Sequence, residues 1–276
     1  MSRPRNLDTV KRKVARLQDQ RRRYGLGHMA LLAARNRLED VALSIEGRRG
    51  VLGPAHQGYG RHSVDANRDT WTGWDWESGG GEEWTVSEPW KASLIEELLV
   101  PNMPQDGVLM EIGPGAGRWS PHLLARASEL VLVDLTSRTL ETCRRQLGDP
   151  TNVRYVLNDG RSLPGVEDES IDGVWSFDAF VHIAPMDVAS YLREIGRVLR
   201  PGSRAVIHHS GAGKPVPSGW RSPMTRKLFA NLASEAGLEV DRQFNAWAGG
   251  QHGVAGYGAA MTIMHAPAIA EAQVTR

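Results

Sequence analysis

The chain of 276 residues is 41% apolar and 24% charged, a composition typical of globular proteins that argues against disordered and fibrous classes. Its single cysteine, Cys143, excludes an internal disulfide and fits a reducing compartment, so we expect a cytoplasmic protein. No apolar run approaches the roughly 18 residues of a membrane span. Residues 1–50 hold 13 of the 33 Lys and Arg but only 5 of the 32 Asp and Glu.

The basic N-terminal segment is predicted to be helical. Apolar residues recur at helical spacing over residues 7–24 and again from Met29 to Ile45. We assign residues 1–60 to a helical extension that packs on the core or, through residues 7–45, on a second subunit. Its charges favour a solvated helix face over a nucleic-acid or membrane surface, because no aromatic residues interleave them and no nucleic-acid motif appears.

Residues 61–100 are predicted to form a cap ahead of the first strand. Residues 51–70 are expected to be a loop, and Ser93 to Val100 an amphipathic helix. Five of the nine tryptophans lie close together in the cap: Trp71, Trp74, Trp76, Trp84 and Trp90. Aromatic faces suit the C–H surface of a sugar or a planar ring, but they can equally pin the segment to the core. The sequence leaves both possibilities open.

A glycine turn is predicted to follow the first strand, Val108 to Glu111. It contains Gly113, Gly115 and Gly117, and a helical pattern from Trp119 to Ala127 comes next. Such a turn offers free backbone N–H groups and the positive end of a helix to a ligand.

The second strand, Leu130 to Val133, ends at an acid, Asp134. Gly113 and Asp134 are 21 positions apart, close to the spacing of a carboxylate that binds a ribose in a βαβ nucleotide site. The pattern fits either a nicotinamide dinucleotide or S-adenosylmethionine.

Several motifs together resemble the class I S-adenosylmethionine-dependent methyltransferases. The segment Glu111 to Gly117 matches their first motif, an acid followed by Gly-x-Gly-x-Gly. Asn158-Asp-Gly160 follows the predicted third strand, Val153 to Leu157, where that family places an acid near the adenine. The segments Ile171–Asp178 and Val198–Gly202 match the fourth strand and the turn into the fifth. The resemblance covers roughly residues 100 to 265 and favours S-adenosylmethionine over a dinucleotide.

The resemblance implies a Rossmann-like α/β sheet of seven strands, mostly parallel with an antiparallel last strand. The core is assigned to residues 101–265, and residues 266–276 to a tail. Strand five is expected at Arg204 to His209, strand six at Leu238 to Trp247 and strand seven at Tyr257 to His265.

The resemblance also implies roles for individual residues. Glu111 would steady the loop and the amino end of the cofactor, the glycines would line its methionine part, and Asp134 would hold the ribose. The predicted cofactor residues are Glu111, Gly113, Gly115, Gly117, Trp119, Asp134, Leu135, Asn158, Asp159, Gly160, Phe177 and, from the cap, Trp84.

Polar residues follow the fourth and fifth strands, where ligands bind in open α/β sheets. Asp178, His182, His208 and His209 could converge there, although neighbouring side chains on one strand face opposite ways. We expect His182 or His208 to act as a general base oriented by Asp178. A divalent metal is possible but not favoured, because a tight ligand spacing is absent.

A narrower resemblance is to bacterial methyltransferases of glycan or secondary-metabolite assembly. It implies O-methylation of a hydroxyl on a sugar or glycan precursor, with S-adenosylhomocysteine as the second product. The alternatives are an N-methyltransferase acting on a small amine or amino sugar, and a non-catalytic S-adenosylmethionine-binding module.

Overall fold

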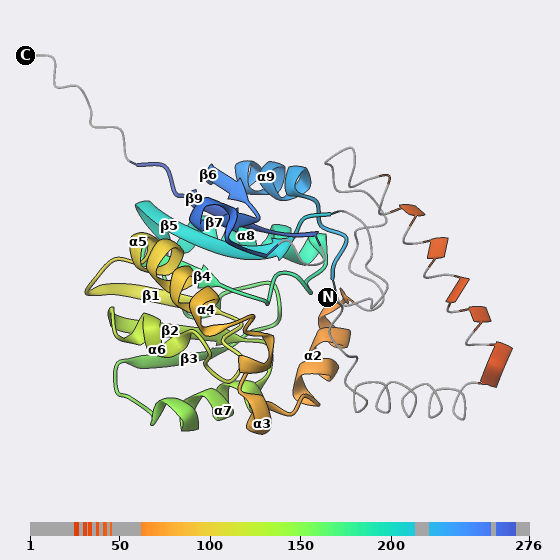
Figure 1. Ribbon diagram of the computed structural model, residues 1–276, viewed down its shortest axis with the longest axis horizontal. Helices are drawn as coiled ribbons and strands as arrows, with labels where there is room; N and C mark the ends of the chain where they lie inside the picture. The colour runs from red at the N-terminus through yellow and green to blue at the C-terminus, as the bar shows by residue number, and fades with distance from the viewer. Residues whose placement is uncertain are drawn as a thin grey trace, which may run out of the picture. The chain divides into compact units, whose positions relative to one another are not determined.

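A sheet of seven strands organises the chain from residue 107 onward (Figure 1). Its strands are β1 (Gly107–Ile112), β2 (Ala127–Asp134), β3 (Val153–Leu157), β4 (Ile171–Ser176), β5 (Leu199–Ser210), β6 (Glu239–Phe244) and β9 (Ala259–His265). Their order is β3-β2-β1-β4-β5-β9-β6, and β9 pairs antiparallel with both β5 and β6. The predicted seven-stranded sheet with an antiparallel last strand is confirmed. A separate ribbon pairs β7 (Ala246–Trp247) with β8 (His252–Gly253).

The computed structural model describes residues 62–212, 221–254 and 258–268, with scattered positions between 25 and 45. The chain divides into two units, Met1–Ala42 and Leu43–Arg276. The predicted helix over residues 7–24 lies outside the described residues, as does most of the predicted tail. Within the predicted helix from Met29 to Ile45, the described positions are helical.

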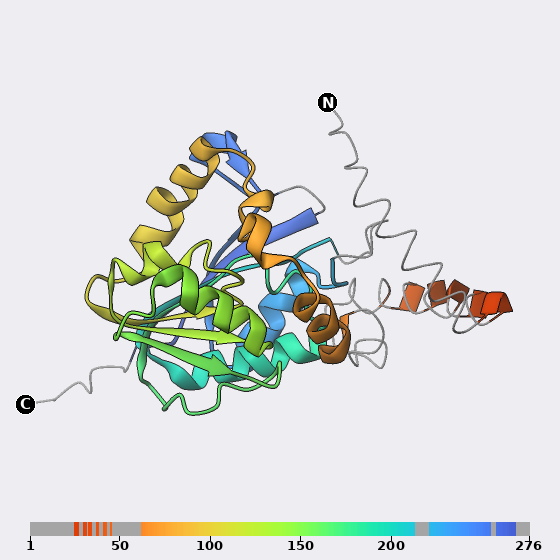
Figure 2. The same cartoon turned by 90° about the horizontal axis from the view of Figure 1, so that it is seen from below.

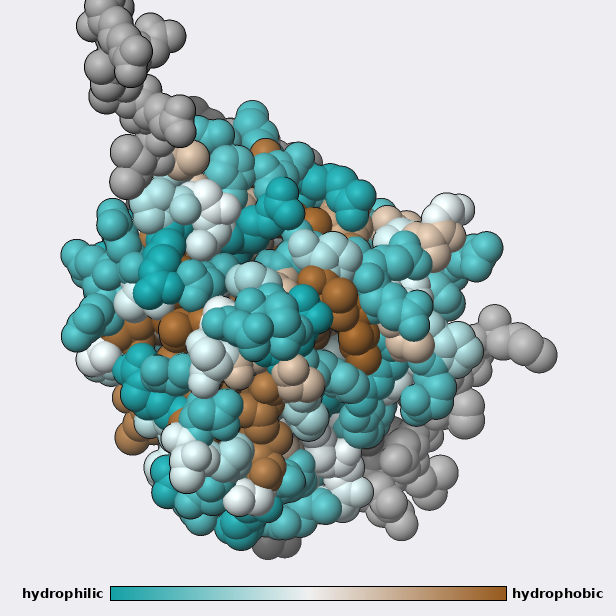
Figure 3. Space-filling model, turned by 90° about the vertical axis from the view of Figure 1, so that its left-hand side faces the viewer, coloured by the Kyte–Doolittle hydropathy of each residue, from teal (hydrophilic) through white to brown (hydrophobic). Residues whose placement is uncertain are grey.

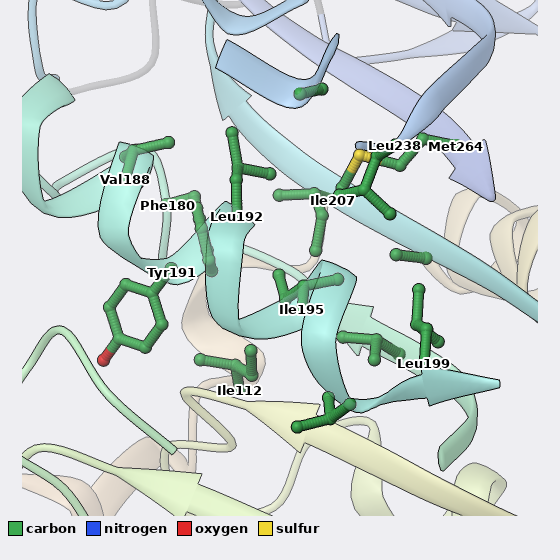
Figure 4. Packing of buried hydrophobic residues seen from close by; sticks show 14 of the residues in the cluster. Ile112, Phe180, Val188, Tyr191, Leu192, Ile195, Leu199, Ile207, Leu238 and Met264 are labelled. Carbon is green, nitrogen blue, oxygen red and sulfur yellow. The ribbon is translucent and has the colours of Figure 1, made fainter. Parts of the chain in front are cut away.

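Apolar side chains on both faces of the sheet are buried by helices. Met110 and Ile112 of β1 belong to a core with α8 (Pro185–Val198) and α9 (Arg226–Glu235), while Leu109 faces the opposite core. Figure 4 shows Leu192 and Ile195 of α8 directed at this sheet surface. The second core contains side chains from α4 (Glu88–Leu94), α6 (Ser120–Leu124) and α7 (Ser137–Leu147). Burial on both faces explains the continuous apolar runs of the parallel strands.

Three predicted boundaries are wrong for physical reasons. Strand six was expected to reach Trp247, but β6 ends at Phe244, because Ala246 and Trp247 pair with β8 in the separate ribbon. Ala127 was expected on a helix, but it begins β2, because its parallel pairing with Gly107 extends the ladder beyond the apolar run. Residues 51–70 were expected to be a loop, yet α2 spans Val64–Thr72. The Ser63 hydroxyl caps α2 by accepting a hydrogen bond from the backbone N–H of Ala66 at 3.2 Å.

The cap is folded onto α7 (Figures 1 and 2). After α2 it continues through α3 (Trp76–Gly79) and a 3₁₀ turn, η3 (Glu82–Trp84), followed by α4, a π-helical turn η4 (Ile95–Leu99) and α5 (Val100–Asn102). Arg138 of α7 donates to the carbonyl of Thr72 at 2.9 Å, and Arg145 pairs with Glu77 at 2.5 Å. The cap is therefore held by specific contacts to α7, the helix that packs on β2 and β3.

Among the described residues, no helix is both long enough and apolar enough to cross a membrane. On the face in Figure 3, apolar residues form separate small patches among polar side chains.

Candidate functional site

The glycine turn after β1 is packed so closely that side chains are excluded. Gly113 and Gly115 have positive φ angles of 73° and 59°. A Cβ at Gly113 would lie 2.5 Å from that of Ala179, and one at Gly115 would lie 2.8 Å from the Trp76 ring. The turn therefore requires glycine for its backbone conformation and for the approach of the cap and of the loop after β4.

Glu111, at the end of β1, is buried under this turn. Its Oε2 accepts a hydrogen bond from the Ser120 hydroxyl at 2.5 Å, while Oε1 has no hydrogen-bond partner among the described residues. Burial raises the pKa of Glu111 to about 7, although the Ser120 hydrogen bond and nearby Arg118 oppose this. A buried carboxylate oxygen without a partner fits the ammonium end of S-adenosylmethionine.

Asp134 ends β2, next to Ile112 and Gly113. The backbone N–H of Gly113 donates to the carbonyl of Val133 at 2.8 Å, which ties the glycine turn to this strand end. The Asp134 carboxylate accepts a hydrogen bond from the Thr136 backbone N–H at 2.9 Å, and burial raises its pKa to about 7. This position fits the predicted ribose contact, a role that stays a prediction.

The turn after β3 is organised by the side chain of Asn158. Its amide donates to the Tyr191 hydroxyl at 2.7 Å and accepts from the Gly160 backbone N–H at 3.3 Å. Asp159 is exposed and caps the next turn by accepting from the Ser162 backbone N–H at 2.8 Å. Asn158 therefore shapes the turn, and Asp159 stays the candidate for an adenine contact.

The cap and Leu135 close over the turn after β3. A Cβ at Gly160 would lie 3.0 Å from Val64 of α2 and 3.2 Å from Leu135. Residues from the ends of β2 and β3 and from α2 thus surround one point, as expected for the adenine end of the predicted site.

The structure pairs Asp178 with His208, across the ends of β4 and β5. Oδ1 of Asp178 lies 3.1 Å from Nδ1 of His208, and Oδ2 lies 2.6 Å from Nη2 of Arg118. Burial would raise the pKa of Asp178, but His208, Arg118 and Arg221 outweigh this effect and hold the pKa well below its usual range. Burial lowers the pKa of His208, and its Nε2 is buried with no hydrogen-bond partner among the described residues.

The other two candidate histidines lie elsewhere. His182 is half-buried against the cap, with its ring centre 5.0 Å from that of Trp71. His209 faces the opposite side of β5 from His208, stacks on Phe229 at 3.7 Å, and hydrogen-bonds the Thr262 hydroxyl at 2.7 Å. His209 is therefore a structural residue, and it does not converge with Asp178 as the sequence had suggested it could.

The tryptophans of the cap divide into two groups. Trp71, Trp74, Trp76 and Trp84 pack on one another with ring centres 5.4 to 6.3 Å apart. Trp90 instead joins a buried aromatic cluster with Trp119, Phe177 and Trp247. The first group lies above Gly115 and His182. Trp119 and Phe177, predicted to contact the cofactor, lie in the second cluster, where Phe177 stacks on His208 at 4.4 Å.

Sequence reasoning did not identify Arg118 and Ser120 as site residues. Both follow the glycine motif directly, so their position after Gly117 was the available signal, but only the fold shows their contacts with Asp178 and Glu111. No group of three or more His, Cys, Asp or Glu placed to hold a metal ion occurs among the described residues.

Known proteins share this domain. Residues 110–207 match the family model described as a methyltransferase domain. An O-methyltransferase of Penicillium expansum, cnsE, is 28% identical over 162 residues, 53% of this chain and 58% of the relative. The methyltransferase GfsG of Streptomyces halstedii is 32% identical over 103 residues, 36% of each chain. This chain thus spans less than two thirds of the length of these curated relatives.

The fold is shared as well. The crystal structure of the N-methyltransferase NodS from Bradyrhizobium japonicum superposes with a TM-score of 0.53 at 14% identity, covering 66% of this chain and 98% of NodS. The glycine turn, the acids that end β1 and β2, and the seven-stranded order accompany the family match. Residues 110–207 therefore match a methyltransferase domain, and the seven-stranded sheet has the fold of NodS.

Proposed function

We propose that this protein transfers a methyl group from S-adenosylmethionine to a hydroxyl of a small molecule, with His208 as the general base. The observation that carries this proposal is the contact between His208 and Asp178 at the carboxyl ends of β4 and β5, beside the glycine turn. Ligands of open α/β sheets bind at this edge.

The cofactor contacts follow from the strand ends. Glu111 would hold the ammonium group, the backbone from Gly113 to Gly117 would line the methionine part, and Asp134 would accept hydrogen bonds from the ribose hydroxyls. Leu135 and Asp159 would flank the adenine. When bound, S-adenosylmethionine supplies an electrophilic methyl group on a sulfonium, so the protein has chiefly to align the acceptor with it.

The His208 ring can serve as a base in only one of its tautomers. With the proton on Nδ1, the ring donates to Oδ1 of Asp178 and leaves the lone pair on Nε2 for the acceptor. In the other tautomer Nδ1 accepts from the Asp178 backbone N–H, 3.2 Å away. Because the pKa of His208 is lowered by burial, the ring is neutral near pH 7 and able to accept a proton.

The tryptophans of the cap support a sugar-like acceptor. Trp84 is 36% exposed, and Trp71 lies between it and His182 with ring centres 6.3 and 5.0 Å away. The ring contacts of Trp84 with Trp71, Trp74 and Trp76 are tilted or edge-on, so they do not cover the face of the Trp84 ring completely. A single aromatic face suits the C–H surface of a sugar.

The test combines cofactor binding with an acceptor screen. Calorimetry should detect S-adenosylmethionine binding, and release of S-adenosylhomocysteine should be measured with glycosides, phenols, amines and amino sugars. Turnover on glycosides supports the proposal, turnover only on amines favours N-methylation, and binding without turnover favours a non-catalytic module.

The base is tested by two matched variants. His208→Asn should lower turnover about 100-fold or more at pH 7, since general bases contribute roughly 10²–10⁴-fold. His182→Asn should change it less. Equal activity of His208→Asn and wild type would refute the assignment of His208.

A further inference from the structure

Arg118 follows the glycine turn directly, yet its side chain is buried. The side chain is 5% exposed, and its Nη2 lies 2.6 Å from Oδ2 of Asp178. The guanidinium carbon lies 4.8 Å from the ring centre of Trp119 and 5.5 Å from that of Phe177. A desolvated cation held between a carboxylate and two aromatic faces has a restricted orientation.

The contacts of Asp178 are divided between its two oxygens. Oδ2 faces Arg118, and Oδ1 faces Nδ1 of His208 at 3.1 Å. The backbone of Asp178 has a positive φ of 66°, and the Phe177 ring beside it stacks on His208. If Oδ2 lost its partner, the carboxylate could rotate away from the histidine.

We propose that Arg118 is a positioning residue that connects the glycine turn to the Asp178–His208 pair. Its guanidinium fixes the Asp178 carboxylate so that Oδ1 receives the Nδ1–H of His208. This selects the tautomer that leaves Nε2 available, and the inference therefore rests on the proposed role of His208 as the base. Because Arg118 directly follows Gly117, one segment of backbone connects the proposed cofactor-binding turn to the Asp178–His208 pair that would take up the proton of the acceptor.

The charged groups around Asp178 and His208 determine how replacing Arg118 changes the pKa of His208. Asp178 is faced by His208 from β5, by Arg118 from the glycine turn and by Arg221 from the segment before α9, with Nη1 of Arg221 3.9 Å from Oδ1. A cation beside a histidine disfavours the protonated ring. Loss of the Arg118 charge by itself would raise the pKa of His208, whereas loss of the Asp178 contact that Arg118 holds in place would lower it. Because the Asp178 contact is the larger influence, the net change should be a lower pKa.

The titration can be measured without substrate or cofactor. Proton–carbon NMR of the His208 Cε1–H, assigned by its disappearance in His208→Asn, should show titration below 6.5 in the wild type. In Arg118→Met we expect the midpoint to fall, because the ring loses its contact with the Asp178 carboxylate, and in Arg118→Lys, which keeps a cation beside Asp178, we expect a smaller fall. If Arg118→Met is unfolded, Arg118→Gln serves as the neutral variant. The matched control is Arg144→Met, which removes an arginine that stacks on Tyr155 at 4.5 Å instead.

The pH dependence of the methyl-transfer rate provides a second test. The acid limb of the pH–rate profile should move to lower pH in Arg118→Met and return toward wild type in Arg118→Lys, whereas a purely structural residue would lower the rate without moving the limb. An unchanged or raised His208 midpoint in the neutral variants overturns the positioning role of Arg118, because a rise is what loss of the charge alone would give. If His208→Asn keeps full turnover while the midpoint still moves, the proposed base fails and the electrostatic link between Arg118 and His208 stands.

Discussion

Replacing Glu111 by glutamine should change the pH dependence of stability in the protein without cofactor. The wild-type carboxyl group is buried, and burial raises its pKa from an ordinary 4.5 to about 7. Because the folded-state pKa is the higher one, the protonated group contributes stability that is complete below pH 4.5 and is lost as the pH rises through 7. Glutamine has no such ionisation.

The magnitude follows from the difference between the two pKa values. A rise from 4.5 to about 7 corresponds to about 3 kcal/mol, at 1.36 kcal/mol per pKa unit. The amide that Glu111→Gln introduces can accept the Ser120 hydrogen bond but brings an N–H without a partner, which costs about 1–3 kcal/mol at every pH. The informative quantity is therefore the stability of Glu111→Gln relative to wild type, which should increase by about 2.5 kcal/mol between pH 5 and pH 8, since the unfolded-state group is already partly ionised at pH 5.

Urea unfolding followed by tryptophan fluorescence measures this quantity. All nine tryptophans lie between Trp71 and Trp247, so the signal reports on the unit that contains the sheet. Glu96→Gln, at an exposed position in η4, is the matched control and should show no such trend. A stability difference for Glu111→Gln that is the same at pH 5 and pH 8 would refute the reasoning. Saturating S-adenosylmethionine should stabilise the wild type more than the variant, because only the carboxylate can pair with its ammonium.

Two further predictions concern the ribose contact and the glycine turn. Asp134→Ala should weaken S-adenosylmethionine binding roughly tenfold or more, since a hydrogen bond to a charged group contributes about 1.5–3 kcal/mol. In the wild type, calorimetry should show weaker binding at pH 6 than at pH 8, because the pKa of Asp134 is raised to about 7 and the ribose needs the carboxylate; equal affinities would contradict this. Gly115→Ala should destabilise the protein by more than Gly165→Ala, because both glycines have positive φ but only Gly115 touches Trp76. Thermal unfolding would decide, and equal losses would show that only backbone strain matters.

The two halves of the site differ in how far the sequence alone could specify them. The cofactor half is built from backbone turns and strand ends. The glycines and the acid one strand later occur at a spacing typical of βαβ geometry, so Gly113 and Asp134 were identifiable by position, whereas Glu111 was identified through the resemblance to the methyltransferases. The proposed acceptor half draws on side chains from the ends of β4 and β5, the glycine turn and the cap, whose mutual distances depend on how the strands are ordered.

Elements of the fold also differ in how far the sequence alone could specify them. The apolar runs and their breaks indicated central strands such as β1, β2 and β4, whose apolar residues are buried, whereas the number of seven strands came from the resemblance. They did not determine where β2 begins, since Ala127 is held there by its pairing with Gly107. Helix α2 was also missed, because its sequence is polar and no α2 residue is fully buried.

What the sequence by itself determined is therefore the class of domain, the position of the glycine turn and the acids at the ends of β1 and β2. Only the tertiary structure decided that Asp178 pairs with His208 and Arg118. The same holds for the packing of His209 on Phe229 and for the position of Trp90, which packs on Trp247 apart from the other cap tryptophans. The physical reason is that local spacing governs turns and periodic burial, whereas partners 30 to 60 residues apart are selected by strand order and by the charges that burial forces together.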